Sequence, residues 1–158
     1  MPSITALLHT KDDALRLGRC LETLYPCDHI LIVDHGSNDD TRRIARQYGA
    51  RFVPARPEAS PEQYLTPGDW ILSLDPHESL TEGLAASLFQ WKAEWKPSNA
   101  ITAYSMSLRE ETPAGWIEHR DMQTRLIPSS WARWRGTVPQ YDPAAQKLEG
   151  ELLRFNFP

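Results

Sequence analysis

The chain has 158 residues, 41% of them hydrophobic and 24% charged, which suits one globular domain. Its formal net charge of -4 and its pI near 5.7 argue against the basic surface that nucleic-acid binding needs. No apolar run reaches the roughly 20 residues of a membrane span and the N-terminus has no secretory-signal pattern, so we expect a cytoplasmic protein without a transmembrane segment.

Strand and helix patterns alternate in the first half of the chain. The strand patterns are short apolar runs, which we expect at 4–8, 30–33, 51–53 and 70–74. The helix patterns are expected from Asp12 or Asp13 to just before Pro26, around 44–48 before Gly49, and from Thr81 to just before Pro97. This alternation predicts an α/β fold with a mostly parallel sheet and helices on both faces.

The remaining segments carry weaker patterns. Residues 54–68 contain four prolines and are expected to form a loop with a single helical turn near 62–65. Residues 100–108 and 116–127 read as partly alternating strands joined around 113–115, which predicts an antiparallel addition at the sheet edge. The segment beyond Tyr141 carries little signal. The two cysteines are expected to be buried free thiols.

Polar clusters follow three of the expected strands. They are His9-Thr10-Lys11-Asp12, Asp34-His35-Gly36-Ser37 and Asp75-Pro76-His77-Glu78. In an open parallel sheet, ligands bind beyond the carboxyl ends of the strands. The sequence therefore predicts one crevice shared by all three clusters.

Asp34 is the best candidate for contact with a nucleoside. A carboxylate at a strand end can accept hydrogen bonds from a ribose hydroxyl or a pyrimidine N–H. Gly36 allows a close backbone turn, and Ser37 or Asn38 can cap the next helix. The alternative is that Asp34 only organises this turn.

Asp75 and His77 are candidate ligands for Mg²⁺ or Mn²⁺. These ions are often held by one or two carboxylates together with substrate phosphates, and they offset the charge of a departing diphosphate. Glu78 could support such a site. The alternative is a strand-to-helix turn in which Asp75 and Glu78 serve the start of the next helix.

Two further groups stand in the second half of the chain. Asp121, near Glu118 and His119, could accept a proton from an attacking hydroxyl, although a solvated strand face is the more common reason for such a group. Trp131 and Trp134, interleaved with arginines, could stack on a sugar or a lipid-linked acceptor, or could form a protein interface.

The chain resembles family-two glycosyltransferases of the GT-A fold, and most of all the bacterial branch related to lipopolysaccharide core glucosyltransferases. The matching stretches are ITALLHTKDDALRLGRCLETL, ILIVDHGSNDDTRRIARQYGA, GDWILSLDPHESLTEGL and, more weakly, RDMQTRLIPSSWARWRGTVPQ. The resemblance implies nucleotide contacts from Thr10, Asp34, Gly36 and Ser37. It also places Asp75 and His77 at the two positions of the metal-binding Asp-x-Asp motif. Asp121 matches the Asp of an Asp-x-Gln-x-Arg-Leu stretch, which makes it the candidate catalytic base.

The sequence departs from the family pattern at three places. Asp75-Pro76-His77-Glu78 stands where relatives usually read Asp-Ala-Asp-Glu, and His is a softer ligand than Asp and a poorer match to Mg²⁺. The segment 53–68 is short and lacks the usual Arg-Asn or Lys-Asn pair. Val138-Pro139-Gln140 replaces the usual Val-His-Glu.

Together these features predict one domain over 1–158, with a nucleotide-binding half (1–98), acceptor-side strands (99–140) and a tail (141–158). The resemblance implies an inverting, Mn²⁺- or Mg²⁺-dependent transfer of a sugar from a UDP- or GDP-sugar to a cell-envelope acceptor, either a saccharide or a lipid-linked one. A homodimer is expected because exposed sheet edges are usually covered. The altered motifs leave open an inactive nucleotide-binding or interaction protein. A weaker alternative is a phosphoesterase that uses Asp75, His77 and Glu78.

Overall fold

A parallel core of four strands forms the first half of the fold. In this computed structural model, which describes residues 1–97 and 102–157, the strands are β1 (Ile4–Thr10), β2 (His29–Asp34), β3 (Arg51–Pro54) and β4 (Trp70–Leu74). β1 lies between β2 and β4 and pairs with both in parallel, and β2 pairs in parallel with β3. All four predicted strands are confirmed, and β1 and β2 extend far enough to include Thr10 and Asp34.

The three predicted helices are also present. They are α1 (Ala14–Glu22), α2 (Thr41–Gln47) and α3 (Glu82–Glu94). The Thr81 hydroxyl caps α3 by accepting a hydrogen bond from the Leu84 N–H at 3.3 Å, as its position in the sequence predicts. Asp13 stands at the N-cap of α1 but makes no capping bond, and the carboxylate of Asp39 accepts from the Ala14 N–H instead. No helix of the described residues is long and apolar enough to span a membrane.

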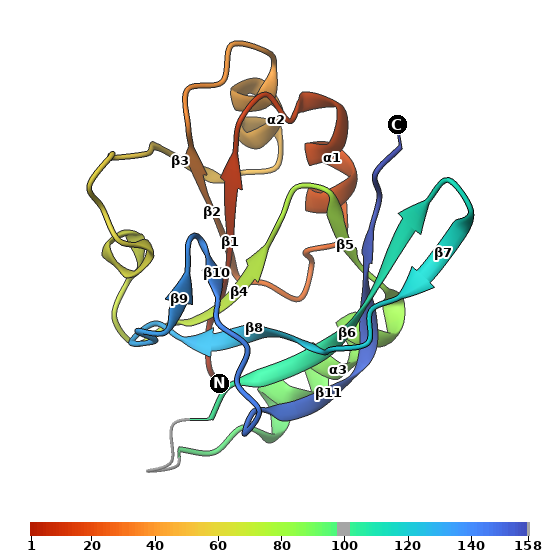
Figure 1. Cartoon of the computed structure of the whole chain (residues 1–158). Coiled ribbons are helices and arrows are strands. Elements are labelled where there is room, and N and C mark those ends of the chain that lie inside the picture. The colour runs from red at the N-terminus through yellow and green to blue at the C-terminus, as the bar shows by residue number, and fades with distance from the viewer. Residues whose placement is uncertain (98–101, 158) are drawn as a thin grey trace.

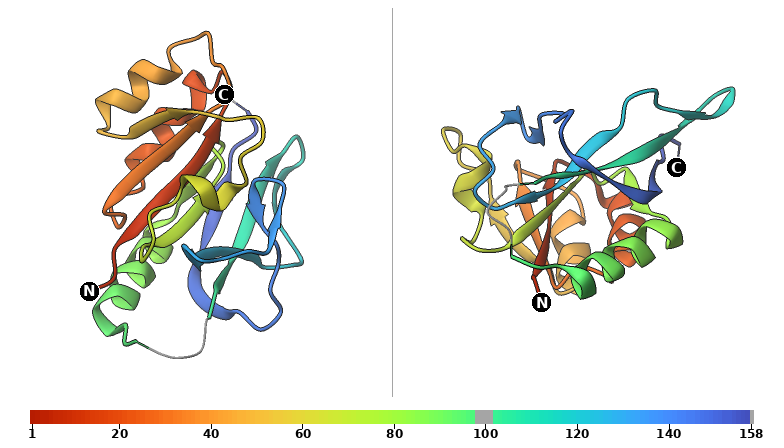
Figure 2. Two further views of the ribbon diagram at one scale, coloured as in Figure 1. Left: turned by 90° about the vertical axis from the view of Figure 1, so that its left-hand side faces the viewer. Right: turned by 90° about the horizontal axis from the view of Figure 1, so that it is seen from below.

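The two faces of the sheet are covered differently (Figure 2). All three α-helices pack on one face, in a core cluster that includes Leu17, Ala45 and Leu88. The opposite face carries the proline-rich loop with its short 3-10 helix η1 (Pro61–Tyr64) and the segment around Trp131. The prediction of helices on both faces therefore holds for one face only. Among the described residues the second face carries only the short turn η1, which the sequence predicted near 62–65.

Trp131 belongs to this second core cluster. Its side chain is only 4% exposed, and the Arg133 guanidinium lies 4.3 Å from the centre of its ring. The indole N–H donates to the Arg133 carbonyl at 2.8 Å. The expectation that Trp131 offers its ring to a sugar, a lipid-linked acceptor or a protein partner was therefore wrong, because the side chain is buried in the second core cluster.

The second half adds antiparallel and parallel strands (Figure 1). They are β5 (Glu78–Leu80), β6 (Tyr104–Thr112), β7 (Gly115–Glu118), β8 (Gln123–Pro128), β9 (Trp134–Arg135), β10 (Val138–Pro139) and β11 (Gln146–Arg154). The nine-stranded sheet has the order β3-β2-β1-β4-β8-β6-β11-β5, with β7 attached to β6, and β9 pairs with β10 apart from it.

The predicted antiparallel addition is confirmed, with differences in its bounds. β6 and β7 form the hairpin expected around 113–115, while the second strand is broken so that β8 begins only at Gln123. β8 pairs in antiparallel fashion with both β4 and β6. Residues 100 and 101, the expected start of the first strand, lie outside the described residues.

The strand β11 forms from the segment that carried little signal in the sequence. It inserts between β6, to which it is parallel, and β5, to which it is antiparallel. Its pairing with β6 shifts register between Lys147 and Glu151, around Gly150. Gly150 has a φ of 101°, and a Cβ built there would collide with the Leu84 backbone nitrogen. The absence of a side chain at this position lets the start of α3 approach β11.

Gly150→Ala is expected to lower the free energy of unfolding by at least about 2 kcal/mol, since it combines a left-handed φ with a backbone collision. Gly115→Ala is the matched control, because Gly115 has a similar φ of 113° but no atom within 4 Å of an added Cβ. Urea denaturation measures both. Equal losses in the two variants would show that the approach of α3 to β11 contributes nothing beyond backbone strain.

Candidate functional site

Thr10 and Asp34 meet at the carboxyl ends of β1 and β2, where they are paired in register. The Thr10 hydroxyl donates to Asp34 Oδ1 at 2.7 Å, and the Ser37 hydroxyl donates to the same oxygen at 2.5 Å. Asp34 Oδ2 accepts from the backbone N–H groups of Gly36 and Ser37 at 3.2 and 2.9 Å. The structure thus brings together the four residues predicted to bind a nucleotide.

These bonds also fix the ionisation of Asp34. Burial acts to raise the pKa of its carboxyl, but the hydrogen bonds from Ser37, Thr10 and Gly36 outweigh burial and lower the pKa below its usual value. The turn-organising role considered for Asp34 is therefore present. A nucleotide would reach this carboxylate only by sharing or replacing some of its donors.

The loops after β1 and β2 hold each other. The Asp12 N–H donates to the Ser37 hydroxyl at 2.8 Å, and the Asn38 N–H donates to Asp12 Oδ1 at 2.6 Å. Lys11 Nζ donates to the Gly36 carbonyl at 2.5 Å. Asp12 itself has a left-handed φ of 51°. These cross-links make the two loops one rigid rim beside Asp34.

A cavity of about 540 Å³ opens beside this rim, with Asp34, His35 and Tyr64 among its lining residues. The Tyr64 hydroxyl accepts from the Arg56 N–H at 2.7 Å, and the Arg56 guanidinium lies 5.1 Å from the centre of the Tyr64 ring. The volume falls in the range of small-molecule sites, roughly 300–1,000 Å³. The cavity combines an aromatic ring with a carboxylate, which suits a nucleoside.

Two histidines lie against each other in the same cavity. His9 Nδ1 is 2.9 Å from His35 Nε2. Burial, together with the neighbouring His35, lowers the pKa of His9 to about 4. His9 is therefore neutral at pH 7 and shares a hydrogen bond with the exposed ring of His35.

Asp75 and His77 also meet, but chiefly with each other. Asp75 Oδ1 lies 2.6 Å from His77 Nδ1 and accepts from the His77 backbone N–H at 2.9 Å. Within residues 1–97 and 102–157, no group of three or more His, Cys, Asp or Glu side chains is arranged to hold a metal ion. The donors present do not form a ready set of oxygens for Mg²⁺ or Mn²⁺. The ligand role of Asp75 and His77 stays a prediction.

Glu78 is fully buried and forms an ion pair that the sequence does not reveal. Its two carboxylate oxygens accept from Arg125 Nη1 at 2.6 Å and Nη2 at 2.9 Å. Oε1 also accepts from the Asp75 N–H at 2.9 Å. Glu78 therefore supports the backbone of Asp75, and both of its carboxylate oxygens are engaged. Arg125 lies in the Asp-x-Gln-x-Arg-Leu stretch, which was the only available signal for it.

Arg154, the last residue of β11, lies beside Asp75 and Glu78, and we call this place beyond the end of β4 the Asp75 corner. Its Nη1 lies 3.5 Å from Asp75 Oδ1 and 3.9 Å from Glu78 Oε2, and its Nε lies 3.8 Å from Glu110 Oε2. Sequence reasoning missed this residue because the strand that carries it was not recognised.

No protein-family model matches the chain. It is 27% identical over 175 residues to LpsC, a lipopolysaccharide core biosynthesis glycosyltransferase of Rhizobium meliloti, which covers 96% of this chain and 63% of LpsC. It is 32% identical over 146 residues to an uncharacterized glycosyltransferase of Rickettsia bellii, which covers 85% of this chain and 49% of that protein. For an uncharacterized glycosyltransferase of Rickettsia felis, 34% identical over 91 residues, the chain spans 32% of the relative's length.

Two solved structures share the fold over about two thirds of this chain. Glucosyl-3-phosphoglycerate synthase of Mycobacterium tuberculosis, in complex with Mn²⁺, UDP-glucose and phosphoglyceric acid, matches with a TM-score of 0.52 at 20% identity over 68% of this chain and 44% of that one. TarS of Staphylococcus aureus matches with a TM-score of 0.51 at 14% identity, over 68% of this chain and 36% of the TarS fragment.

The chain has the GT-A glycosyltransferase fold. The predicted resemblance to glycosyltransferases, including one of lipopolysaccharide core synthesis, is confirmed. The chain spans less than two thirds of the length of each of these relatives.

Asp121, the predicted catalytic base, is more exposed to solvent than Asp34. It is exposed, on the connection between β7 and β8. Because β8 runs antiparallel to β4, the start of β8 lies at the edge of the sheet where β4 ends. Asp121 is thus at the same edge as Asp75. Its neighbour His119 is paired with Glu110 at 2.7 Å, whereas Glu118 and Asp121 are exposed, so the role of Asp121 stays a prediction.

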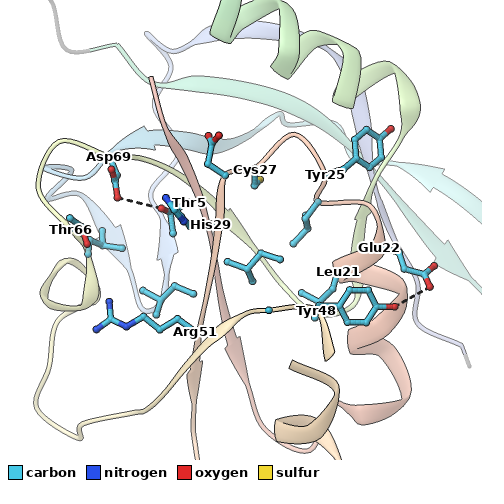
Figure 3. Close-up of a pocket in the computed structure, with 16 residues that line it drawn as sticks. Thr5, Leu21, Glu22, Tyr25, Cys27, His29, Tyr48, Arg51, Thr66 and Asp69 are labelled. Atoms are coloured by element: carbon cyan, nitrogen blue, oxygen red, sulfur yellow. Dashed lines mark hydrogen bonds between the residues drawn. The ribbon is translucent and has the colours of Figure 1, made fainter. Parts of the chain in front are cut away.

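A larger cavity of about 820 Å³ lies away from the predicted residues (Figure 3). Thr5 and His29, near the starts of β1 and β2, line it together with Tyr48 and Arg51. The Tyr48 hydroxyl donates to Glu22 at 3.0 Å on one side of this cavity. In an open α/β sheet ligands bind at the carboxyl ends of the strands, so the smaller cavity beside Asp34 is the better candidate site for the GT-A fold.

Arg125→Met is expected to lower the free energy of unfolding by about 3–5 kcal/mol, because it leaves the buried Glu78 without its partner. Urea denaturation measures the loss. The control is Arg43→Met, which removes an exposed ion pair with Asp40 and should cost less than about 1 kcal/mol. Adding Glu78→Gln to Arg125→Met should recover part of the loss, since it removes the uncompensated charge. No recovery would contradict this account.

The lowered pKa of His9 predicts a loss of stability in mild acid. The unfolded chain takes up a proton near pH 6.5 and the folded protein only near pH 4, so folding is progressively penalised as the pH falls through this window. Urea denaturation at pH 6.5 and pH 4.5 should therefore show a smaller stability difference in His9→Gln than in the parent chain. An NMR titration that finds His9 half-protonated near pH 6.5 would contradict the prediction.

Proposed function

We propose that this chain transfers a sugar from a nucleotide-diphosphate donor to a cell-envelope acceptor, either a saccharide or a lipid-linked one. The observation that carries the proposal is the convergence of Thr10, Asp34 and Asp75 at one edge of the sheet. β2, β1 and β4 are adjacent and parallel, so all three residues stand at neighbouring carboxyl ends. The similarity to LpsC supports the choice of a cell-envelope acceptor.

In this proposal the nucleoside occupies the cavity of about 540 Å³ beside Asp34. Tyr64 supplies an aromatic face, and the rigid rim of Gly36 and Ser37 sets the depth to which the base enters. The diphosphate then extends from β2 across β1 toward the end of β4. This direction leads it to the corner of Asp75.

The acceptor hydroxyl attacks the anomeric carbon of the donor from the side opposite the diphosphate. The new C–O bond forms as the bond to the diphosphate oxygen breaks, and the electron pair leaves with the nucleotide. Asp121 takes the proton of the attacking hydroxyl. Inversion of the anomeric centre is carried over from the resemblance and stays part of the proposal.

The sequence predicts that Asp75 and His77 hold Mn²⁺ or Mg²⁺ on the diphosphate, and the mycobacterial synthase was solved with Mn²⁺. In this chain Asp75 Oδ1 is engaged by His77, and both oxygens of Glu78 are engaged by Arg125. These donors fit a divalent ion poorly, and no step of the proposed reaction depends on one. A cytoplasmic location and a homodimer stay predictions.

A second candidate function is nucleotide binding without turnover. The exposure of Asp121 favours it, because a general base works best where its pKa can be tuned by burial. The two candidates share the nucleotide site and differ only in the chemistry at the acceptor side.

Calorimetric titration is expected to show binding of UDP or GDP, and Asp34→Asn should weaken it about 10- to 100-fold through loss of a charged acceptor. Asp40→Asn, an exposed neighbour paired with Arg43, is the control and should bind like the parent. Asp121→Asn should leave binding unchanged and lower donor turnover about 10²- to 10⁴-fold.

Each result points to one candidate. Binding without any hydrolysis or transfer of the donor sugar would favour the non-catalytic function. Failure of both UDP and GDP to bind would contradict the proposed function as a whole.

A further inference from the structure

The end of β11 is fixed against the turn that carries Asp75. Arg154 is paired in register with Glu78, and the Phe155 N–H donates to the His77 carbonyl at 2.8 Å. Phe155 is itself held by the Arg19 guanidinium, 4.0 Å from its ring centre, and by Trp116 edge-on. The guanidinium of Arg154 is thus delivered to the diphosphate corner by regular strand pairing.

The donors of Arg154 are not used up by its neighbours. Among the described residues its contacts are charge contacts of 3.5–3.9 Å to Asp75, Glu78 and Glu110. None of these is a hydrogen bond of good length, since N–H···O bonds lie at about 2.7–3.2 Å. The side chain is 29% exposed. A partly exposed, planar guanidinium with free N–H groups suits bidentate binding of phosphate oxygens.

The carboxylates near Arg154, in contrast, are already engaged by hydrogen bonds and ion pairs. Glu78 is buried and bound at both oxygens by Arg125, and Asp75 Oδ1 is bound by His77 and faced by Arg154. A Mg²⁺ ion demands about six oxygen ligands at about 2.0–2.1 Å. Here a divalent ion would have to displace a histidine and approach a fixed positive charge.

We infer that Arg154 supplies the positive charge for the donor's diphosphate in place of a divalent metal ion. This inference rests on the proposed function and adds a binding residue to it. As the bond between the anomeric carbon and the diphosphate oxygen breaks, the electron pair goes to that oxygen and the guanidinium stabilises the charge. The proton of the acceptor hydroxyl goes to Asp121, so the step needs no further reactant.

The electrostatics of the corner set a limit on this binding. Asp75, Glu78 and Glu110 face Arg125 and Arg154, so the diphosphate must take Arg154 from its carboxylate neighbours. The exchange is favourable because the existing contacts are long, whereas a phosphate can accept two short charge-assisted hydrogen bonds.

Calorimetric titration first identifies which of UDP and GDP binds more tightly to the parent chain. That nucleotide and its nucleoside are then titrated in buffer with EDTA and in buffer with Mn²⁺. The dissociation constant of the parent chain for the nucleoside diphosphate should differ by less than about 2-fold between the two buffers, since no metal ion takes part. Arg154→Met should weaken diphosphate binding about 10- to 100-fold and leave nucleoside binding unchanged, since the loss corresponds to charged hydrogen bonds. Arg109→Met is the matched control, because Arg109 is a partly exposed β6 arginine 3.7 Å from Glu151.

Arg154→Lys guards against a purely structural effect. Lysine keeps the positive charge but lacks the planar, two-pronged guanidinium. The affinity of this variant for the diphosphate should therefore fall between those of the parent and Arg154→Met. Unchanged nucleoside binding shows that the nucleotide site is intact. Binding that requires Mn²⁺ and ignores Arg154 would overturn the inference while leaving the proposed function standing. Equal effects of Arg154→Met and Arg109→Met would overturn it as well. Absence of any nucleotide binding would instead overturn both.

Discussion

The parallel pairing of β1 with its two neighbours is the constraint on which the rest of the site depends. It sets Thr10 beside Asp34 and brings the end of β4 to the same edge. The hydrogen bond from Thr10 to Asp34 then ties the two strand ends together, and the loops that follow are linked to each other through Asp12. A shift of β1 by one residue against β2 would move Thr10 to the opposite face and separate all of these groups.

The corner beyond β4 is organised by charge pairing and depends on strands far away in the sequence. Glu78 lies at the start of β5, its partner Arg125 is on β8, and Arg154 is at the end of β11. A buried bidentate pair of this kind is costly to break and fixes the direction in which neighbouring groups point. The backbone of Asp75 is held by the same carboxylate, so the position of Asp75 relative to the nucleotide rim is set by the ion pair beneath it.

Local chemistry explains what the sequence could predict. The four parallel strands, the Thr81 cap and the turn from Asp34 to Ser37 were predictable because each depends on residues within one short segment. The meeting of Thr10 with Asp34 followed from the parallel order of the strands. β11 was not, because Leu148, Leu152 and Leu153 do not alternate regularly across the bulge at Gly150. Arg125 and Arg154 were missed as partners of Glu78 because their importance lies in pairing across the sheet. Trp131 was placed on the surface because the stacking of Arg133 over it cannot be read from their adjacency.

The position of β11 has a consequence for how the protein folds. The strand lies between β6 and β5, although β5 ends at Leu80 and β11 begins only at Gln146. Pairings between segments so distant in sequence are slow to form, since the long loop must close before the contacts are gained. During folding the nucleotide rim can assemble early, because the two loops that form it are close in sequence. The arrangement around Asp75 waits for the long-range pairing of β11 with β5 and β6, and until that pairing forms the backbone edges of both strands stay open.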